Sequence, residues 1–360
     1  MNLMDVENSL KRWLDPYLRQ DLFSAKMIKN IIIVDDRVSF EVTLGYPCHD
    51  FHPVIVEALT QKVKHDTGAH SVTITITQEI VSHAVQKNLK PLKGVKNIIA
   101  VASGKGGVGK STTAVNLAAS LARDGAKVGI LDADIYGPSV PHMLGLSGRP
   151  EIKPGDRITP KQAFNLDVMS IGFLVDEDQP MIWRGPMVTG ALQQLLQQTD
   201  WAGIDYLIID LPPGTGDIQL SLSQQIPVSG AVIVTTPQDI ALLDAQRGLK
   251  MFQQVNIPVL GLIENMSIHI CSHCGHEEAL FGEGGGQKMA NKYGTDLLGA
   301  LPLDLSIRHQ ADEGYPVVIA DPDGDIAHRY RDIARRMTAQ LALKSRDYSA
   351  RFPTISVVND

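Results

Sequence analysis

Cysteine, positive charge and long apolar runs are all scarce in this chain of 360 residues. With only three cysteines, a scaffold held by disulfides is not expected. Acidic residues outnumber basic ones, 40 to 33, which argues against a dominant nucleic-acid-binding surface. No run of 18 apolar residues occurs, so we expect no membrane-spanning helix. Residues 1–15 lack the apolar segment of a signal peptide, so the expected compartment is the cytoplasm, and neither a membrane nor nucleic acid is an expected partner.

The composition is that of an ordinary globular protein, with 44% hydrophobic and 20% charged residues. The length is sufficient for two domains. We expect a small α/β domain over residues 1–90, a linker over 91–96 that contains Pro91 and Gly94, a larger domain over 97–345, and a loose tail over 346–360.

The first 90 residues show short alternating patterns. Strands are expected over 31–34 and 38–44, because apolar and polar residues alternate there. A helix over 51–66 and a strand over 71–77 follow. A short helix over 10–19 is also expected, although Pro16 lies within it.

From residue 97 onward, short apolar runs alternate with helical segments. Nearly continuous apolar runs are typical of strands that are buried on both faces of a parallel sheet. We therefore expect a doubly wound, mostly parallel α/β sheet that binds its ligand at the carboxyl ends of the strands. The later runs cover residues 128–132, 206–210, 231–236 and 259–263. A late helix over 326–343 carries an apolar stripe; we favour packing on the sheet, with a membrane-surface helix as the alternative.

Residues 104–111 read Gly-Lys-Gly-Gly-Val-Gly-Lys-Ser and fit G-x-x-x-x-G-K-[ST], the phosphate-binding loop. An apolar strand over 97–102 precedes the loop and a helical segment over 111–121 follows it, as the motif requires. Glycines let backbone N–H groups approach phosphate oxygens, and the helix N-terminus adds partial positive charge. We expect Lys110 to reach the β- and γ-phosphates and Ser111 to bind Mg²⁺; a plain glycine-rich turn is the alternative.

A second nucleotide motif follows the apolar run over 206–209. The run ends in Asp210 and continues as Leu-Pro-Pro-Gly-Thr-Gly-Asp. An apolar strand that ends in aspartate is the Walker B pattern, whose carboxylate would hold Mg²⁺ through water. A helix-capping role is the alternative, but Asp210 ends a strand and does not directly precede a helix.

Lys105 is a second lysine in the loop, which an ordinary phosphate-binding loop does not require. The G-K-G-G-x-G-K-[ST] sequence resembles that of a group of dimerising ATPases, which includes the Min and Par positioning ATPases, the nitrogenase iron protein and the Mrp/ApbC-type iron–sulfur cluster carriers. The resemblance implies that Lys105 reaches across a homodimer interface to the partner's nucleotide. It also implies that Asp132 lies near the Mg²⁺ shell, that Asp134 orients the attacking water, and that Asn265 contacts the adenine of ATP. The expected ATP-binding residues are Gly104, Lys105, Gly106, Gly107, Val108, Gly109, Lys110, Ser111, Thr112, Asp132, Asp210 and Asn265.

Cys271 and Cys274 have a spacing at which two thiolates can ligate one metal centre. A thioredoxin-type redox pair is disfavoured, because the flanking sequence does not show a strand followed by a helix start. A structural zinc site stays open, since His269, His273 and His276 are near in the sequence. The third interpretation is an iron–sulfur cluster shared by two subunits. The glycine-rich segment 281–287 that follows is expected to let the backbone pack closely or to begin a helix over 287–293.

Four segments together resemble the Mrp/ApbC-type carriers over about residues 96–340. They read GKGGVGKS, DADIYGPS, IDLPPGTGD, and ENM followed by C-x-x-C. The resemblance implies an ATPase with slow hydrolysis that holds a [4Fe–4S] cluster at a homodimer interface through Cys271 and Cys274. Apo iron–sulfur proteins would be the recipients and cluster-assembly scaffolds the donors. The first 90 residues resemble the small iron–sulfur assembly domain often fused to such carriers, in which Cys48 is either functional or an ordinary thiol.

Two other functions share parts of this pattern. A Min- or Par-like positioning ATPase, acting on a membrane or DNA, would use the same loop and Lys105, with a structural zinc at the cysteines. A reductase like the nitrogenase iron protein would also share a cluster between subunits, but its cysteines are expected to be far apart in the sequence.

Overall fold

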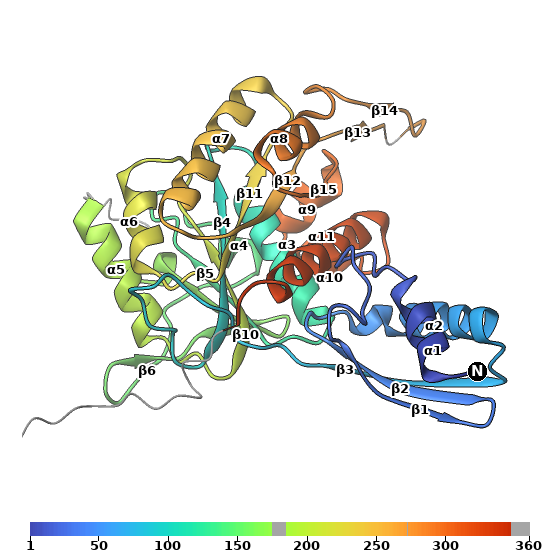
Figure 1. Cartoon of the computed structure of the whole chain (residues 1–360). Helices are drawn as coiled ribbons and strands as arrows, with labels where there is room; N and C mark the ends of the chain where they lie inside the picture. The colour runs from blue at the N-terminus through green and yellow to red at the C-terminus, as the bar shows by residue number, and fades with distance from the viewer. Residues whose placement is uncertain (175–184, 272, 347–360) are drawn as a thin grey trace, which may run out of the picture.

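The computed structural model describes residues 1–174, 185–271 and 273–346, so the tail predicted over 346–360 lies outside the described residues apart from Arg346. A sheet of eight strands forms its centre, in the order β15-β12-β11-β4-β10-β5-β9-β8 (Figure 1). Every neighbouring pair is parallel except β8 with β9. The mostly parallel, doubly wound sheet that the sequence predicts is therefore confirmed. The strands are β4 (Val95–Ser103), β5 (Val128–Asp132), β8 (Lys161–Ala163), β9 (Leu166–Ser170), β10 (Ile204–Asp210), β11 (Gly230–Thr235), β12 (Val259–Glu264) and β15 (Leu297–Ala300).

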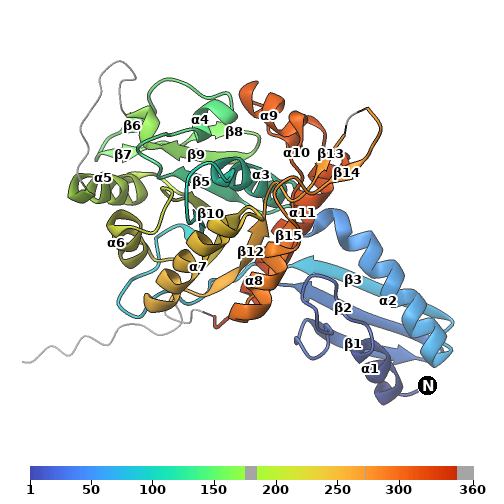
Figure 2. The ribbon, with the colours of Figure 1, turned by 90° about the horizontal axis from the view of Figure 1, so that it is seen from above.

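Helices cover both faces of this sheet (Figure 2). One face carries α5 (Gly185–Gln198), α6 (Asp217–Gln225), α7 (Asp239–Gln254) and α8 (Gly285–Tyr293). The other carries α3 (Lys110–Arg123), α4 (Val140–Met143), α9 (Leu305–Asp312), α10 (Val317–Ala320) and α11 (Asp325–Ala342). Because helices cover both faces, β5, β10 and β11 are buried along all or nearly all of their length. None of the helices in the described residues is long and apolar enough to cross a membrane.

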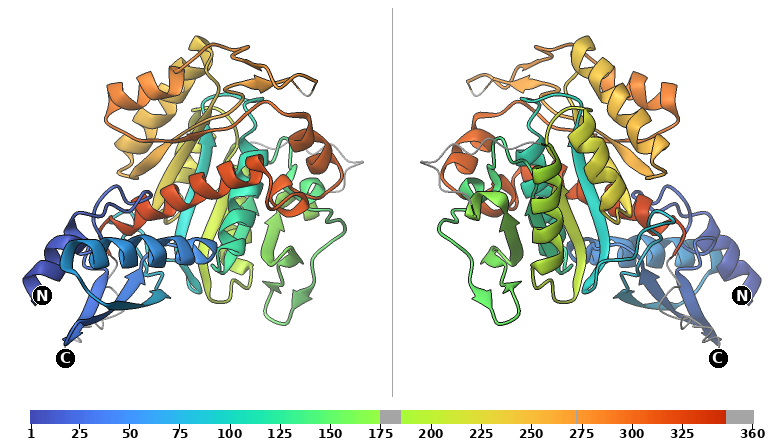
Figure 3. Two further views of the ribbon diagram at one scale, coloured as in Figure 1. Left: turned by 90° about the vertical axis from the view of Figure 1, so that its right-hand side faces the viewer. Right: turned by 90° about the vertical axis from the view of Figure 1, so that its left-hand side faces the viewer.

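The N-terminal residues form a separate three-stranded sheet with two helices on it (Figure 3). Strand β1 (Ile28–Val34) is antiparallel to β2 (Arg37–Leu44), and β2 is parallel to β3 (Ser71–Gln78). The connection from β2 to β3 passes through a 3-10 turn, His49–Phe51, and helix α2 (His52–Thr67). These strands and α2 lie where the sequence predicts them.

The helix predicted over 10–19 is wrong. Helix α1 spans Leu3–Lys11, seven residues nearer the N-terminus at its start. Asn2 caps it, because its side chain accepts a hydrogen bond from the Asp5 N–H while Asp5 accepts one from the Asn2 N–H. Pro16 lies beyond the helix, in a turn where the Asp15 carboxylate accepts bonds from following backbone N–H groups.

Two hydrophobic cores are present in the described residues, one for the large sheet and one for the N-terminal sheet. Helix α11 belongs to both of them. Tyr330, Ile333 and Met337 are buried in the larger core, as the interpretation of a helix packed on the sheet predicts, and Ala339 contributes to the smaller one. The division of the chain near residue 90 stays a prediction, because this last helix joins the two cores.

A buried ion pair lies at the junction of the two cores. Arg335, on α11, donates two hydrogen bonds to the Asp124 carboxylate at 2.7 and 2.8 Å and a third to the Tyr17 hydroxyl at 3.1 Å. Its guanidinium also lies over the rings of Tyr17 and Phe51. Asp124 is the C-terminal cap of α3, the helix that begins at the nucleotide motif. The ion pair therefore holds the N-terminal residues against the C-terminal end of that helix.

Candidate functional site

The phosphate-binding loop connects the end of β4 to the start of α3. Gly107 and Gly109 both have φ of 80°, in the left-handed region that favours glycine. Gly104 is required for a different reason: a Cβ there would lie 2.2 Å from the backbone of Asp244 on α7. The loop is therefore shaped by backbone conformation and by close contact with α7, and its N–H groups are left to face a ligand.

Lys110 is the first residue of α3, and its side chain is buried. Its Nζ donates to the Asp210 carboxylate at 2.6 Å and to the Ser111 hydroxyl at 3.2 Å, and it lies 3.7 Å from Asp134. The structure therefore brings together four of the predicted site residues from three separate segments. An entering polyphosphate would compete with Asp210 for this ammonium group.

Asp210 and Asp132 end neighbouring strands and are directly opposite each other in the register of β10 and β5. Both side chains are fully buried. Burial and the neighbouring Asp210 charge raise the pKa of Asp132 to about 7. Burial also raises the pKa of Asp210 and of Asp134, against the opposing effect of Lys110.

Asp132 holds the loop that follows β5. Its carboxylate accepts hydrogen bonds from the N–H groups of Asp134 and Val140 and from the Ser170 hydroxyl, at 3.1 to 3.2 Å. The sequence did not indicate this positioning role, because Ser170 is distant in the chain. Asp134 is thereby placed beside Lys110, where a nucleophile-orienting carboxylate is expected; that role stays a prediction.

The carboxylate oxygen Oδ2 of Asp210 is buried and has no hydrogen-bond partner among the described residues. A buried carboxylate oxygen without a partner is costly unless a ligand satisfies it. Ser111 also lies within reach, since its hydroxyl lowers the pKa of the Asp210 carboxyl against the larger effect of burial. Oxygen donors of this kind suit Mg²⁺, so the residues present fit the ion that the motif implies.

Asn265 follows β12 and lies against the phosphate-binding loop. Its side-chain Nδ2 donates to the Val108 carbonyl at 2.9 Å, and a Cβ on Gly109 would lie 2.2 Å from it. The amide is therefore near the nucleotide motif, but its contact with adenine stays a prediction. Lys105 is half-buried and has no ion pair within the described ranges, which leaves its ammonium group available.

The cysteine pair lies at a short antiparallel hairpin made by β13 (His269–Ile270) and β14 (Glu277–Glu278). Cys271 is half-buried and Cys274 is exposed. Hydrogen bonds from the N–H groups of Cys274 and His273 to the Cys271 sulfur lower the pKa of that thiol. The hairpin is unlike the helix start of a thioredoxin-type pair, and it projects from the edge of the molecule (Figure 1).

Within the described residues, no group of three or more histidine, cysteine or acidic side chains is placed to hold a metal. His269 is directed instead toward the Leu303 carbonyl, with its Nδ1 3.2 Å from that oxygen. A zinc site completed by these histidines within one chain therefore has no support in this geometry. One chain offers two thiolates, and a four-thiolate shell requires a second pair.

Cys48 is fully buried beside Tyr46 at the start of the 3-10 turn. Burial raises the pKa of this thiol, so it stays protonated. It is inaccessible to a metal in this conformation. Of the three cysteines, only Cys271 and Cys274 are open to a cluster.

Glu264 is a residue that the sequence analysis missed. Its carboxylate accepts a hydrogen bond from the Gly286 N–H and so ties the glycine-rich segment after the cysteines to the end of β12. Helix α8 begins at Gly285, two residues before the predicted start. The only signal for Glu264 was its position next to Asn265, at the carboxyl end of a predicted strand.

Comparisons with known proteins identify the family of this chain. The family model described as "NUBPL iron-transfer P-loop NTPase" matches residues 94–338, and the one described as "Iron-sulfur cluster assembly protein" matches residues 3–76. The chain is 49% identical to the "Iron-sulfur cluster carrier protein" of Escherichia coli K12, over 93% of this chain and 91% of that protein. It is 53% identical to mouse "Iron-sulfur cluster transfer protein NUBPL", over 73% of this chain and 83% of that protein.

Solved structures show the same fold. A nucleotide-binding protein from Archaeoglobus fulgidus, solved with ADP, is similar over 66% of this chain and 93% of its own, with 36% identity and a TM-score of 0.57. The cell-division ATPase MinD of Pyrococcus furiosus aligns over 67% of this chain and 98% of its own with a TM-score of 0.51, but at 22% identity it supports the fold alone. The matched family model, the nucleotide loop and the cysteine pair coincide in one unit, and the chain belongs to the NUBPL-type iron-transfer P-loop NTPases, as its resemblance to the cluster carriers predicted.

Proposed function

We propose that this protein is an ATP-hydrolysing iron–sulfur cluster carrier whose cargo is a [4Fe–4S] cluster bound between two copies of the chain. The observation that supports this most directly is the hairpin with Cys271 and Cys274. It presents one accessible thiol pair, lowers the pKa of Cys271, and has no third ligand among the described residues. A two-fold axis through the cluster would bring the same pair from a second chain and complete four thiolate ligands.

The nucleotide site of the proposed carrier uses residues that converge on Lys110. Lys110 would bind the β- and γ-phosphates, and Asp134 would orient the attacking water. Ser111 and Asp210 would hold Mg²⁺, which when bound neutralises charge on the phosphates. Lys105 would reach the nucleotide of the partner subunit, and the hydrolysis would be slow.

Transfer is proposed to run from cluster-assembly scaffolds to apo iron–sulfur proteins in the cytoplasm. An exposed hairpin is suited to such exchange, because incoming thiolates can reach the cluster from outside. A Min- or Par-like role is the weaker proposal. The helix that could have lain on a membrane, α11, buries its apolar stripe in the two cores.

Anaerobic reconstitution with iron and sulfide tests the carrier proposal. Wild-type protein should bind about four iron and four sulfide per dimer, show the broad absorption of a [4Fe–4S] cluster, and activate an apoprotein that requires one. Cys271→Ala and Cys274→Ala should lose the cluster and the transfer while they still bind ATP. Cys48→Ala is the matched control and should keep both, because Cys48 is buried. Stoichiometric cluster transfer by the Cys271→Ala/Cys274→Ala protein would refute the proposal.

A further inference from the structure

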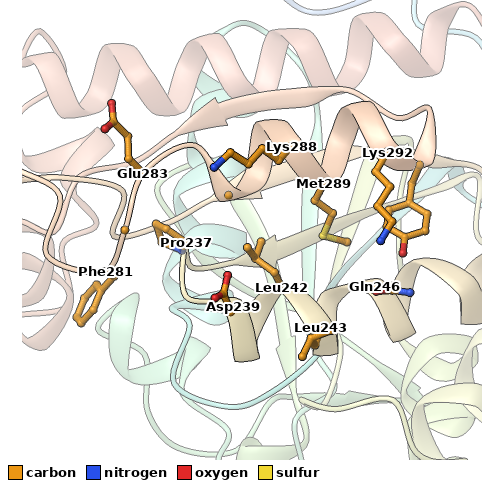
Figure 4. Close-up of a pocket in the computed structure, with 13 residues that line it drawn as sticks. Pro237, Asp239, Leu242, Leu243, Gln246, Phe281, Glu283, Lys288, Met289 and Lys292 are labelled. Atoms are coloured by element: carbon orange, nitrogen blue, oxygen red, sulfur yellow. The ribbon is translucent and has the colours of Figure 1, made fainter.

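A cavity of about 500 Å³ lies between α7 and α8, apart from the nucleotide loop and the thiol pair (Figure 4). Its size is in the range of ligand-binding pockets. Leu242, Leu243, Phe281 and Met289 supply apolar surface, and Lys288 and Lys292 stand one helical turn apart on α8. We call these six residues the α7/α8 groove.

The groove is preformed by tight packing at one end. A Cβ on Gly285 would lie 2.6 Å from the Leu242 side chain and 2.8 Å from the Pro237 carbonyl, so α8 starts in close contact with α7. The bond from the Gly286 N–H to Glu264 fixes the same segment to the sheet. This wall of the groove is therefore ordered before a ligand binds, so the free-energy cost of ordering it does not oppose binding.

Apolar surface extends beyond the cavity. Leu243 is 58% exposed, and Ile240 and Leu280, each next in sequence to a lining residue, are 70% and 49% exposed. Exposed apolar side chains that gather around a cavity indicate a protein interaction site more than isolated ones do. The extent of this rim favours a protein segment over a small molecule.

The charges of the groove select the chemistry of that segment. Lys288 and Lys292 have no ion pair among the described residues, and the Lys292 ammonium lies 5.5 Å from the Tyr293 ring. Neither acidic residue of the lining is paired with these lysines. Glu283 points away from the apolar residues of the groove (Figure 4). Asp239 lies in the first turn of α7, where its carboxylate complements the helix dipole. The two lysines therefore complement an incoming carboxylate.

We propose that the α7/α8 groove binds a segment of the recipient protein in which a bulky apolar side chain stands beside carboxylates. The apolar side chain enters between Leu242 and Met289, and the carboxylates meet Lys288 and Lys292. The wall containing Phe281 follows β14 directly, so the same chain segment that carries the thiol pair leads into the groove. The inference rests on the carrier function proposed above and adds the surface by which a recipient is held during transfer.

Fluorescence anisotropy with two labelled hexapeptides tests the proposal. One probe carries leucine and phenylalanine between glutamates, and the other has lysines in place of the glutamates. The acidic probe should bind wild-type protein at least about tenfold more tightly than the basic one. Lys288→Glu/Lys292→Glu should remove this preference, and Leu243→Ser should weaken binding of the acidic probe.

Matched controls come from exposed residues elsewhere. Lys90→Glu/Lys93→Glu makes the same change in net charge, and Val54→Ser removes a similarly exposed apolar side chain; both should bind the probe like wild type. The transfer rate to an apoprotein with an acidic, apolar segment should fall in the Lys288→Glu/Lys292→Glu protein, with its ATPase rate and cluster content unchanged.

The outcomes separate this inference from the carrier function. If the protein is loaded with a cluster normally, but wild-type and charge-reversed protein bind the probe equally, the groove proposal is refuted and the carrier proposal is not. If wild type binds the probe in a charge-dependent way but cannot be loaded with a cluster, the carrier proposal is refuted and the groove proposal is not. If the charge-reversed protein no longer has the mass of a dimer, and wild type does not bind the probe, the surface is a contact between copies of the chain. That outcome refutes the proposal.

Discussion

Single residues in the nucleotide site show an imbalance of charge. One buried cation, Lys110, faces the carboxylates of Asp132, Asp134 and Asp210. Burial raises the pKa of each of the three carboxyls, and the neighbouring Asp210 charge raises those of Asp132 and Asp134 further. These carboxyls therefore release their protons at a higher pH than exposed carboxyls do, and a bound divalent cation would oppose that shift.

A pH dependence of stability follows for Asp132. Its pKa is about 7 in the folded protein and about 3.9 in an unfolded chain, so the folded state binds the proton more tightly. The resulting stabilisation is complete below about pH 4 and is lost as the pH rises toward 7. Asp132→Asn should remove this part of the dependence, about 2 to 3 kcal/mol between pH 5 and 7.5.

Urea unfolding of the nucleotide-free protein at several pH values measures this effect. The free energy of unfolding should fall more steeply with pH in wild type than in Asp132→Asn. Asp323→Asn, at an exposed position, is the control and should follow wild type. Parallel curves for wild type and Asp132→Asn would show that Asp132 does not carry the proton.

Elements of secondary structure are held together by contacts between distant parts of the chain. The Arg335–Asp124 pair joins α11 to the end of α3, and Arg331 on the same helix pairs with Asp50 in the 3-10 turn at 3.1 Å. Both arginines are buried, although the sequence places them outside the apolar stripe. Helix α11 therefore holds the N-terminal residues by charge as well as by apolar packing.

Arg335→Met should destabilise the protein by about 3–5 kcal/mol, because it leaves the buried Asp124 carboxylate without its partner. Arg335→Met/Asp124→Leu should recover part of the loss. The exposed Arg12 provides the control: Arg12→Met should cost about 0–1 kcal/mol, because Asp66 keeps its bonds to Ser9 and Lys62. Thermal unfolding of the four proteins measures these differences; a double variant no more stable than Arg335→Met alone would contradict the assignment.

Local sequence patterns predicted the strands of the large sheet and the position of the phosphate-binding loop, because both depend on neighbours in the chain. The start of α1 was missed because the capping interaction of Asn2 with Asp5 outweighs the apolar pattern further along. The partners of Arg335 and of Asp132 lie in remote segments, so periodicity carries no signal for them. For the same reason the α7/α8 groove, built from segments on either side of the cysteine hairpin, was not predicted.

At the scale of the whole molecule, the proposed function requires a second copy of the chain, at the thiols and at Lys105. If Lys105 acts on the partner's nucleotide, Lys105→Ala and Asp134→Ala homodimers should both be inactive. Equal mixing should then restore about a quarter of the wild-type ATPase rate, because half of the dimers are mixed and each has one complete site. Phosphate release after mixing measures this. An inactive mixture that contains mixed dimers by native mass spectrometry would place the action of Lys105 within its own subunit.

The position of α11 has a consequence for biosynthesis. Domains generally fold in the order in which the ribosome makes them, with the N-terminal one first. Here Arg335 and Ala339, which are made after all the strands of the large sheet, complete the junction and the core of the N-terminal sheet. In a nascent chain, Tyr17 and Cys48 therefore lack their final cover until α11 has been made.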